Sequence, residues 1–232
     1  MSLRRKHYEN GQGVVEYALI AAGVAVVTML ILSMMGVSVR DVFCEVNSTF
    51  GGEGCGCTMG FDDSSDLDGW TGADVGKTLG VQNGQLCNTN SRHSFFSACN
   101  SGDAQSDFTA NLSGIDINPK GNNSHPGFDF LFRTDGNTSN GYWMSYSAKA
   151  NRITFWKGVN GKRVFMTTQR VPADWVNGGL DLQLKAEGDT FTVYQDGEQI
   201  MQASDSTYTE GKFAWRNKPG SSTCIDEMSI SQ

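Results

Sequence analysis

The chain has few histidines and no excess of positive charge, and both absences exclude classes of function. Its three histidines, His7, His93 and His125, are too scattered to indicate a catalytic triad or a zinc site. The formal net charge is −7, whereas a protein that binds nucleic acid needs a basic face for the phosphates. The sequence therefore predicts no nucleic-acid partner.

Charge is also missing from a long apolar run near the N-terminus. Residues 18–39 are 22 residues without a charged side chain; as an α-helix they would span roughly 33 Å, enough to cross a membrane. Arg4, Arg5 and Lys6 precede the run and an acidic domain follows it. The positive-inside rule then places the N-terminus in the cytoplasm. All six cysteines follow the run, which fits an oxidising compartment beyond the membrane.

A carboxylate at the start of this run needs an explanation, because an ionised group in hydrocarbon costs several kcal/mol. The segment Gly11–Tyr17, GQGVVEY, follows a short basic leader and precedes the uncharged apolar run. Over about residues 11 to 50 the chain resembles the prepilin motif of Flp (type IVb, tight-adherence) pilins. That resemblance implies cleavage after Gly11 by a prepilin peptidase, which leaves Gln12 as the N-terminus. Glu16, followed by Tyr17, can then meet the new amine of a neighbouring subunit during assembly.

Past the run the sequence changes character and predicts an all-β domain. A Gly/Cys-rich linker covers 47–58, and from 59 onward short alternating segments are separated by Gly, Asn and Asp turns. Phe128, Phe130 and Phe132, for example, alternate with other residues as in a strand. Hairpins are indicated at 158–161 and at Asp196-Gly197.

The order of these segments, from FDDSSDLDGW at 61–70 to CIDEMSIS at 224–231, resembles concanavalin A-like (laminin G-like) jelly rolls. The predicted fold class is thus a long N-terminal α-helix, transmembrane or filament core, plus an all-β sandwich. Its parts are a cleaved leader at 1–11, a pilin helix at 12–46, the linker at 47–58 and the sandwich at 59–232. Glucanases of the superfamily carry alternating acids on one strand; the segment 224–228 lacks two of them, so we expect no enzyme.

Binding residues are expected among aromatic side chains on neighbouring strands and a polar loop beside them. Aromatic rings on an outer face can stack on sugars or proteins, although burial in the core explains the same residues. The loop would contact sugar hydroxyls, or it is a solvated turn. The candidates are Tyr142, Trp143, Trp156, Asp135, Asn137 and Asn140.

Two further expectations concern a metal and the cysteines. No cofactor is predicted except calcium, which some jelly rolls hold near their first and last strands, here at Asp62, Asp63 and Asp226. Six cysteines allow fifteen connectivities. Predicted strand neighbours favour Cys87 with Cys99 and Cys57 with Cys224, which leaves Cys44 with Cys55; metal binding by the Cys55-Gly56-Cys57 segment is the alternative.

These observations predict a structural pilin subunit that polymerises into an extracellular Flp/Tad filament and displays a lectin-like sandwich for adhesion. Its expected partners are other copies of itself, the prepilin peptidase and pilus assembly machinery, the membrane before assembly, and a glycan or other surface ligand. We expect the protein to lie in the cytoplasmic membrane before assembly and on a prokaryotic cell surface, in an extracellular filament, afterwards. The alternatives are a membrane-anchored carbohydrate-binding protein that does not polymerise, and a minor pilin or pseudopilin.

Overall fold

The computed structural model describes residues 57–73, 75–89, 94–96, 106–119, 125–136, 138–177 and 179–231. These residues form an all-β sandwich with two short 3-10 helices, η1 (Ser64–Leu67) and η3 (Ala173–Asn177). None of the helices in these ranges is long and apolar enough to cross a membrane. The predicted fold class, which added a long helix to the sandwich, is therefore corrected to all-β. The segment 12–46 and its residues Gly11, Gln12, Glu16 and Tyr17 lie outside the described residues.

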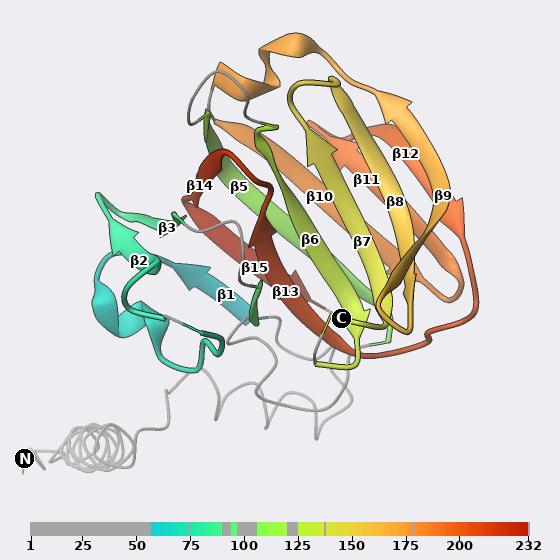
Figure 1. Cartoon of the computed structure of the whole chain (residues 1–232), viewed down its shortest axis with the longest axis horizontal. Coiled ribbons are helices and arrows are strands. Elements are labelled where there is room, and N and C mark those ends of the chain that lie inside the picture. Colours follow the sequence, from blue (N-terminus) through green and yellow to red (C-terminus); the bar gives the residue numbers. More distant parts are fainter. Residues whose placement is uncertain are drawn as a thin grey trace, which may run out of the picture. The chain divides into compact units, whose positions relative to one another are not determined.

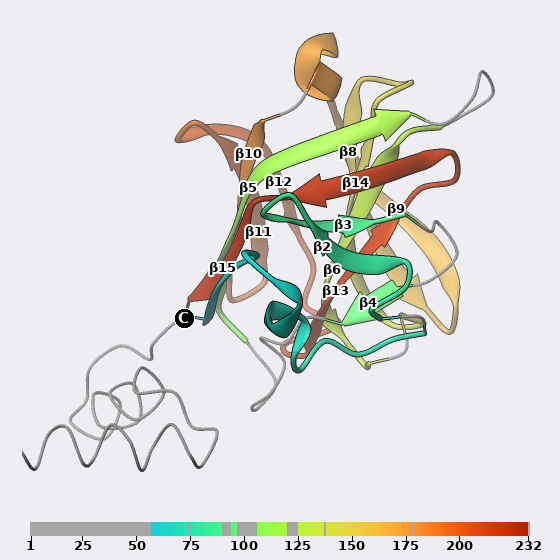
Figure 2. The same cartoon turned by 90° about the vertical axis from the view of Figure 1, so that its left-hand side faces the viewer.

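Two antiparallel sheets make up the sandwich, one in front of the other in Figure 1 and separated in the turned view of Figure 2. The six-stranded sheet has the order β4 (Ser94–Phe96), β13 (Lys212–Asn217), β6 (Gly127–Thr134), β7 (Gly141–Ser147), β8 (Arg152–Val159) and β9 (Lys162–Arg170). The nine-stranded sheet contains β12 (Glu198–Ser204), β11 (Thr190–Gln195), β10 (Leu180–Glu187), β5 (Phe108–Pro119), β14 (Ser221–Ile225), β3 (Gln85–Asn88) and β2 (Leu79–Gln82), with β15 (Glu227–Ser231) between β5 and β1 (Cys57–Gly60).

The core lies between the sheets and follows from the two-residue period of the strands. In β6 and β7 the inward residues are Phe128, Phe130, Phe132, Tyr142, Met144 and Tyr146, each fully buried. Side chains such as Leu112 of β5 and Leu184 of β10 meet them from the opposite sheet. Every second residue of the six-stranded sheet therefore points away from the core.

The two predicted hairpins are confirmed. Asn160-Gly161 joins β8 to β9, and Asp196-Gly197 joins β11 to β12. All four residues have positive φ, between 51° and 78°, as a two-residue turn between twisted strands requires.

A bulge at the end of β6 turns Arg133 into the domain. Arg133 itself has φ +48°, and the backbones of Gly141 and Gly211 press against it. A Cβ atom on Gly211 would lie 2.4 Å from the Arg133 carbonyl carbon, and one on Gly141 would lie 2.8 Å from the Arg133 oxygen. Only glycine fits at both positions, which explains why two glycines flank this bulge.

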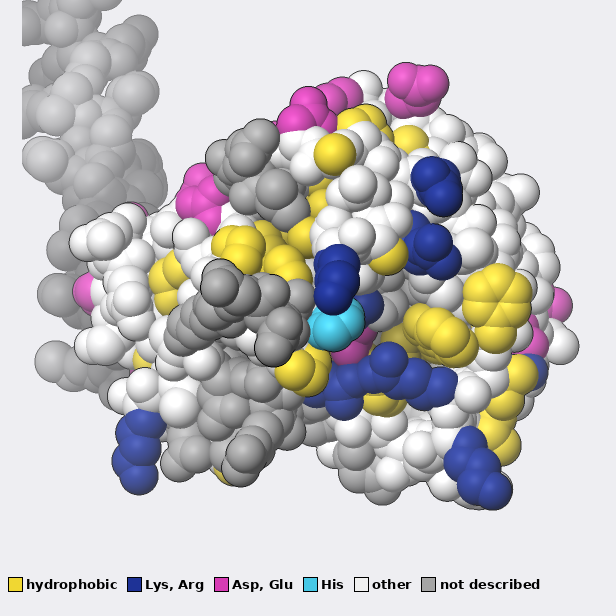
Figure 3. All heavy atoms as spheres, turned by 45° about the horizontal axis from the view of Figure 1, so that its top comes forward, with side chains coloured by type: hydrophobic (Ala, Val, Ile, Leu, Met, Phe, Trp, Pro, Cys, Tyr) yellow, Lys and Arg dark blue, Asp and Glu magenta, His cyan; other side chains and the backbone are white. Residues whose placement is uncertain are grey.

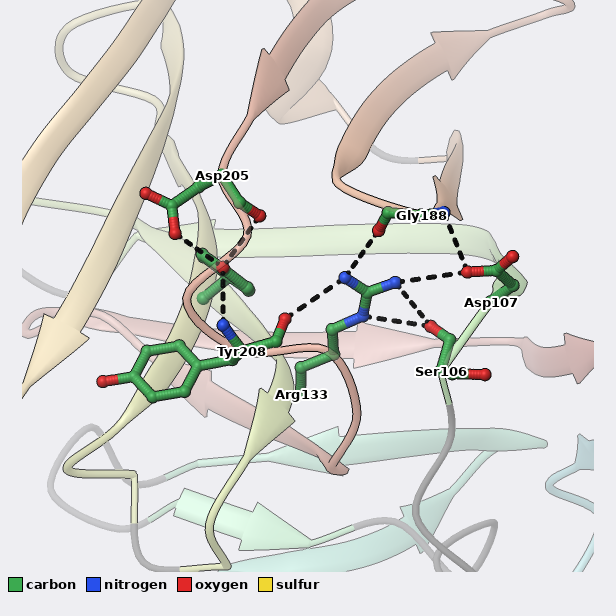
Figure 4. Close-up of polar contacts among 7 residues, drawn as sticks. Ser106, Asp107, Arg133, Gly188, Asp205 and Tyr208 are labelled. Atoms are coloured by element: carbon green, nitrogen blue, oxygen red, sulfur yellow. Dashed lines mark hydrogen bonds and ion pairs between the residues drawn. The ribbon is translucent and has the colours of Figure 1, made fainter.

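The guanidinium of Arg133 ties together segments far apart in sequence (Figure 4). Its nitrogens donate to the carbonyl oxygens of Ser106 (2.7 Å), Gly188 (2.8 Å) and Tyr208 (3.2 Å). Asp107 adds an ion pair at 3.5 Å. One buried cation thus fixes the start of β5, the β10–β11 turn and the loop after β12. Its N–H groups donate to carbonyl oxygens that have no hydrogen bond within the strands.

One disulfide differs from the predicted pattern. Cys87 of β3 bonds to Cys224 of β14, directly opposite it in the sheet. The predicted pairs Cys87–Cys99 and Cys57–Cys224 are therefore wrong. Cys57 is also disulfide-bonded, while Cys44, Cys55 and Cys99 lie outside the described residues. The prediction failed because it assumed that β3 pairs with the strand that follows it, whereas β14 pairs with β3 from the far end of the sequence.

Candidate functional site

The outer face of the six-stranded sheet carries a set of aromatic, cationic and hydroxyl side chains that the core does not use. We define this outer face by the residues Asp129, Leu131, Trp143, Ser145, Arg152, Thr154, Trp156, Arg163, Phe165, Thr168 and Arg216. They come from β6, β7, β8, β9 and β13, which are adjacent in the sheet. Side chains from five strands therefore meet on one surface.

Trp143 forms the floor of this face. Only 6% of its surface is exposed, and it packs with Leu131, Ala214 and Trp156 in a small apolar cluster separate from the main core. Two guanidinium groups lie over its ring, that of Arg163 at 3.7 Å and that of Arg216 at 4.3 Å from the ring centre. A cation–π interaction with a desolvated indole contributes about 2 kcal/mol of favourable free energy. Trp143 thus fixes the position of both guanidinium groups.

Gly158 makes room for that indole. A Cβ atom at position 158 would lie 3.3 Å from Trp143 Nε1 and 3.0 Å from the carbonyl oxygen of Ser139. These distances are shorter than comfortable van der Waals contacts, so a side chain here would displace the ring or the loop. The missing side chain at Gly158 therefore allows the Trp143 ring to lie in its observed position.

Asp129 is the buried counter-ion of both arginines. Its side chain is 1% exposed, and its Oδ2 accepts from Arg216 Nη2 at 2.6 Å and Arg163 Nη2 at 3.1 Å. Ser145 Oγ donates to the other oxygen at 2.5 Å. Burial by itself would raise the pKa of Asp129, but Arg216, Arg163, Lys218 and the Ser145 hydrogen bond outweigh it and lower the pKa. The carboxylate is ionised at neutral pH.

Above this floor lies an open pocket of about 360 Å³. Its aromatic wall is Trp156 and Phe165, whose rings meet edge to face with centres 5.7 Å apart. Phe165 is 56% exposed and, with Val164, is one of two exposed large hydrophobic side chains among the described residues. The polar wall consists of Ser145, Ser147, Thr154, Thr168, Arg152, Arg163 and Lys218. Figure 3 shows this face, with Lys and Arg side chains gathered around hydrophobic ones in its hollowed centre and acidic side chains mostly at the edges.

Of the six residues predicted to bind a ligand, the structure brings two together on this face, Trp143 and Trp156. Tyr142 points the other way into the core with no exposed surface, where its hydroxyl donates to Asp205 at 2.8 Å. Burial raises the pKa of the Tyr142 hydroxyl. We therefore leave Tyr142 out of the proposed ligand contacts.

The predicted polar loop before β7 supports the sheet. Asn140 Nδ2 donates to the exposed Asp135 at 2.7 Å, and its Oδ1 accepts from the backbone N–H of Asn160 at 2.9 Å. Asn140 thus holds the β8–β9 turn against the loop. Asn137 lies outside the described residues.

Two of the three aspartates predicted to bind calcium make other contacts. Asp63 caps η1 and accepts from Ser65 N at 2.7 Å and from the Ser65 hydroxyl. Asp226 Oδ1 accepts from Gln85 Nε2 at 2.7 Å, and Asp62 is exposed. In the part of the chain that the structure describes, no three His, Cys, Asp or Glu side chains are grouped to hold a metal. These residues do not fit the predicted calcium site.

Sequence reasoning missed the charged half of the outer face. Asp129 of β6, Arg163 of β9 and Arg216 of β13 are absent from the site residues that the sequence predicts. One signal was present, since a carboxylate between Phe128 and Phe130 in a strand of aromatic residues needs a partner. The sequence alone does not say which cation supplies it.

Comparisons with known proteins identify the fold. The chain is 35% identical to the levanase of Bacillus subtilis (strain 168) over 108 residues, which are 47% of this chain and 15% of the levanase. The carbohydrate-binding module CBM66 from Bacillus subtilis superposes with a TM-score of 0.53 and 26% identity, over 71% of this chain and 96% of the module. No protein-family model matches the chain. The described residues thus have the jelly-roll fold of carbohydrate-binding modules.

Two further structures show how widely this fold is used. The Bacillus licheniformis β-glucanase superposes with a TM-score of 0.59 and 12% identity, over 77% of this chain and 99% of the enzyme. The VIP36 exoplasmic/lumenal domain, solved in a Ca²⁺/Man3GlcNAc-bound form, gives a TM-score of 0.53 and 11% identity, over 75% and 87%. At these identities only the fold is shared. It does not separate a binding protein from an enzyme, and the absence of catalysis stays a prediction.

Proposed function

We propose that the chain binds carbohydrate in the pocket on the outer face of the six-stranded sheet. The observation that carries this proposal is the half-exposed Phe165 beside Trp156, over a row of hydroxyl and guanidinium donors. A sugar ring has an apolar C–H face and a rim of hydroxyls, so it suits an aromatic wall next to polar groups. The pocket volume of about 360 Å³ lies within the usual range for small-ligand sites.

The comparisons support the same function. CBM66 is a carbohydrate-binding module by name, and the name levanase denotes an enzyme that acts on the polysaccharide levan. The matched segment covers only 15% of the levanase. We therefore propose carbohydrate binding for this chain and do not propose the catalytic activity of the levanase. A fructan oligosaccharide is accordingly the first neutral ligand to test.

The test is calorimetric titration of the full-length chain with levan oligosaccharides and a panel of other glycans. Phe165→Ala should weaken binding about tenfold, because stacking on an exposed ring contributes roughly 1 kcal/mol or more. Val164→Ala is the matched control, since Val164 is 45% exposed on the same strand but does not line the pocket. Normal binding by Phe165→Ala would contradict this location of the site, and no binding to any glycan would contradict the function.

We further propose that the domain works at a cell surface. The Cys87–Cys224 disulfide supports this location, because such bonds form and persist in oxidising compartments. The pilin resemblance of residues 11–50 is outside the described residues, and assembly into filaments stays a prediction. N-terminal sequencing of protein from isolated surface material tests it: Gln12 as the first residue supports processing, and an intact Met1 contradicts it.

A further inference from the structure

The pocket on the outer face carries a positive charge that the rest of the protein does not share. The full chain has a formal net charge of −7. The residues that line the pocket include Arg152, Arg163 and Lys218 and no carboxylate. Arg216 and the buried carboxylate Asp129 lie beneath them, so four cations and one carboxylate leave a local charge of +3. The field in the pocket therefore has the opposite sign to the protein as a whole.

Two of these cations form no salt bridge in the described part of the chain, although Asp129 also attracts Lys218. Arg163 and Arg216 share Asp129, but Arg152 and Lys218 make no ion pair there. The Nε–H of Arg152 is buried and donates to no acceptor in the described part of the chain. Burial and the neighbouring Arg163 and Arg216 also lower the pKa of Lys218, although Asp129 opposes them. Crowded, partly buried cations of this kind are stabilised by an added anion.

The shape of the pocket restricts what that anion is attached to. The cations lie beside the rings of Trp156 and Phe165 and the hydroxyls of Ser147 and Thr168, within about 360 Å³. A flat nucleic-acid or membrane surface would instead need basic side chains spread over a wide face. An acidic protein surrounding a small basic pocket favours one anionic group on a compact, partly apolar ligand.

We propose that the ligand of this pocket is an acidic saccharide, a sugar chain whose carboxylate or sulfate group meets Arg152, Lys218 and Arg163 while a ring stacks on Phe165. This proposal rests on the proposed carbohydrate-binding function and names its ligand class. Guanidinium groups match the two oxygens of a carboxylate or sulfate. The neutral hydroxyl rim of a fructan would leave Arg152 without a counter-charge, and Lys218 with only Asp129, which Arg163 and Arg216 already share.

The experiment titrates the full-length chain with matched pairs of oligosaccharides. One pair is a galacturonate trisaccharide and its methyl ester, and another is a sulfated galactose oligosaccharide and its desulfated form. At least one acidic member should bind about tenfold or more tightly than its neutral partner, as expected for a charge-assisted hydrogen bond. Raising the NaCl concentration from 50 to 500 mM should weaken that binding and leave the neutral partner unchanged.

Variants locate the effect. Arg152→Gln and Lys218→Gln should each weaken binding of the acidic oligosaccharide about tenfold at an unchanged melting temperature. Lys162→Gln is the matched control, because Lys162 is an exposed cation on β9 that does not line the pocket. Acidic binding that both pocket variants retain would overturn the proposal.

The outcomes also separate this proposal from the function beneath it. If the acidic and neutral members of each pair bind with equal affinity, the acidic ligand is overturned and carbohydrate binding remains. The same holds if levan oligosaccharides bind as tightly as the acidic members. If free acetate or sulfate binds as tightly as the charged oligosaccharide, the pocket is an anion site that does not recognise the sugar. That result would overturn the proposal. The absence of binding to every saccharide would overturn both.

Discussion

Replacing Asp129 by Asn tests whether the buried carboxylate holds the outer face together. The substitution keeps the shape of the side chain and removes the charge that pairs with Arg163 and Arg216. Breaking a buried ion pair costs about 3–5 kcal/mol. We expect the lower end, about 3 kcal/mol, because the two arginine side chains are 35% and 22% exposed and regain some hydration.

The pH dependence of the effect identifies its cause. The pKa of Asp129 is lower in the folded protein than the usual value of about 4 in the unfolded chain. Its ionised form therefore contributes full stability above pH 4, and this contribution is lost as the pH falls through the lowered folded pKa. The difference in stability between the parent protein and Asp129→Asn should be constant from pH 7 to 5 and should shrink below pH 4.

Urea unfolding followed by tryptophan fluorescence measures this difference, since Trp143 lies under both arginines. Arg216, Arg163 and Lys218 are the charged groups that face Asp129, and all three are cations that favour its ionised form. Ser145→Ala, which removes one hydrogen bond and no charge, is the control and should cost about 1 kcal/mol at every pH above 4. An Asp129→Asn variant as stable as the parent at pH 7, or a difference that persists unchanged to pH 3, would show that the Asp129 charge does not stabilise the outer face.

Three further perturbations test the supports of the fold. Arg133→Met should lower the free energy of unfolding by about 3–5 kcal/mol in urea, because it leaves three carbonyls without their donor; a loss below 1 kcal/mol would contradict the network. Replacing Cys87 and Cys224 by Ala should cost up to about 5 kcal/mol for a loop of 137 residues, and an unchanged melting temperature would contradict a stabilising bond. Gly158→Ala should cost about 1–2 kcal/mol and shift the fluorescence of Trp143, since the added methyl group meets its ring; a stabilised variant would refute that contact.

Part of the site was predictable. Trp143 and Trp156 were proposed from their alternation in neighbouring strands, and both lie on the outer face. Tyr142 was proposed with them, yet it belongs to the core, because adjacent residues of a strand point to opposite sides and a local pattern does not say which side is outside. The cations that complete the pocket were not predicted at all. An Arg or Lys in a strand looks the same in sequence whether it is solvated or paired.

The strands and turns of the sandwich are predictable from local sequence. The alternation of Phe128, Phe130 and Phe132 and the turn at Asp196-Gly197 are encoded in neighbouring residues, so they could be read without knowing the rest of the chain. Which strands are neighbours depends on the packing of the complete domain. It placed β14 beside β3 and so paired Cys87 with Cys224, 137 residues apart.

The same holds for the charges of the outer face. Asp129 and Arg216 are brought within 2.6 Å because β6 pairs with β13, and Arg163 reaches the same carboxylate from the edge strand β9. The order and register of strands depend on the packing of the whole core, which no short segment encodes. Local periodicity therefore fixed what each segment becomes, and long-range pairing decided which side chains meet to form the pocket.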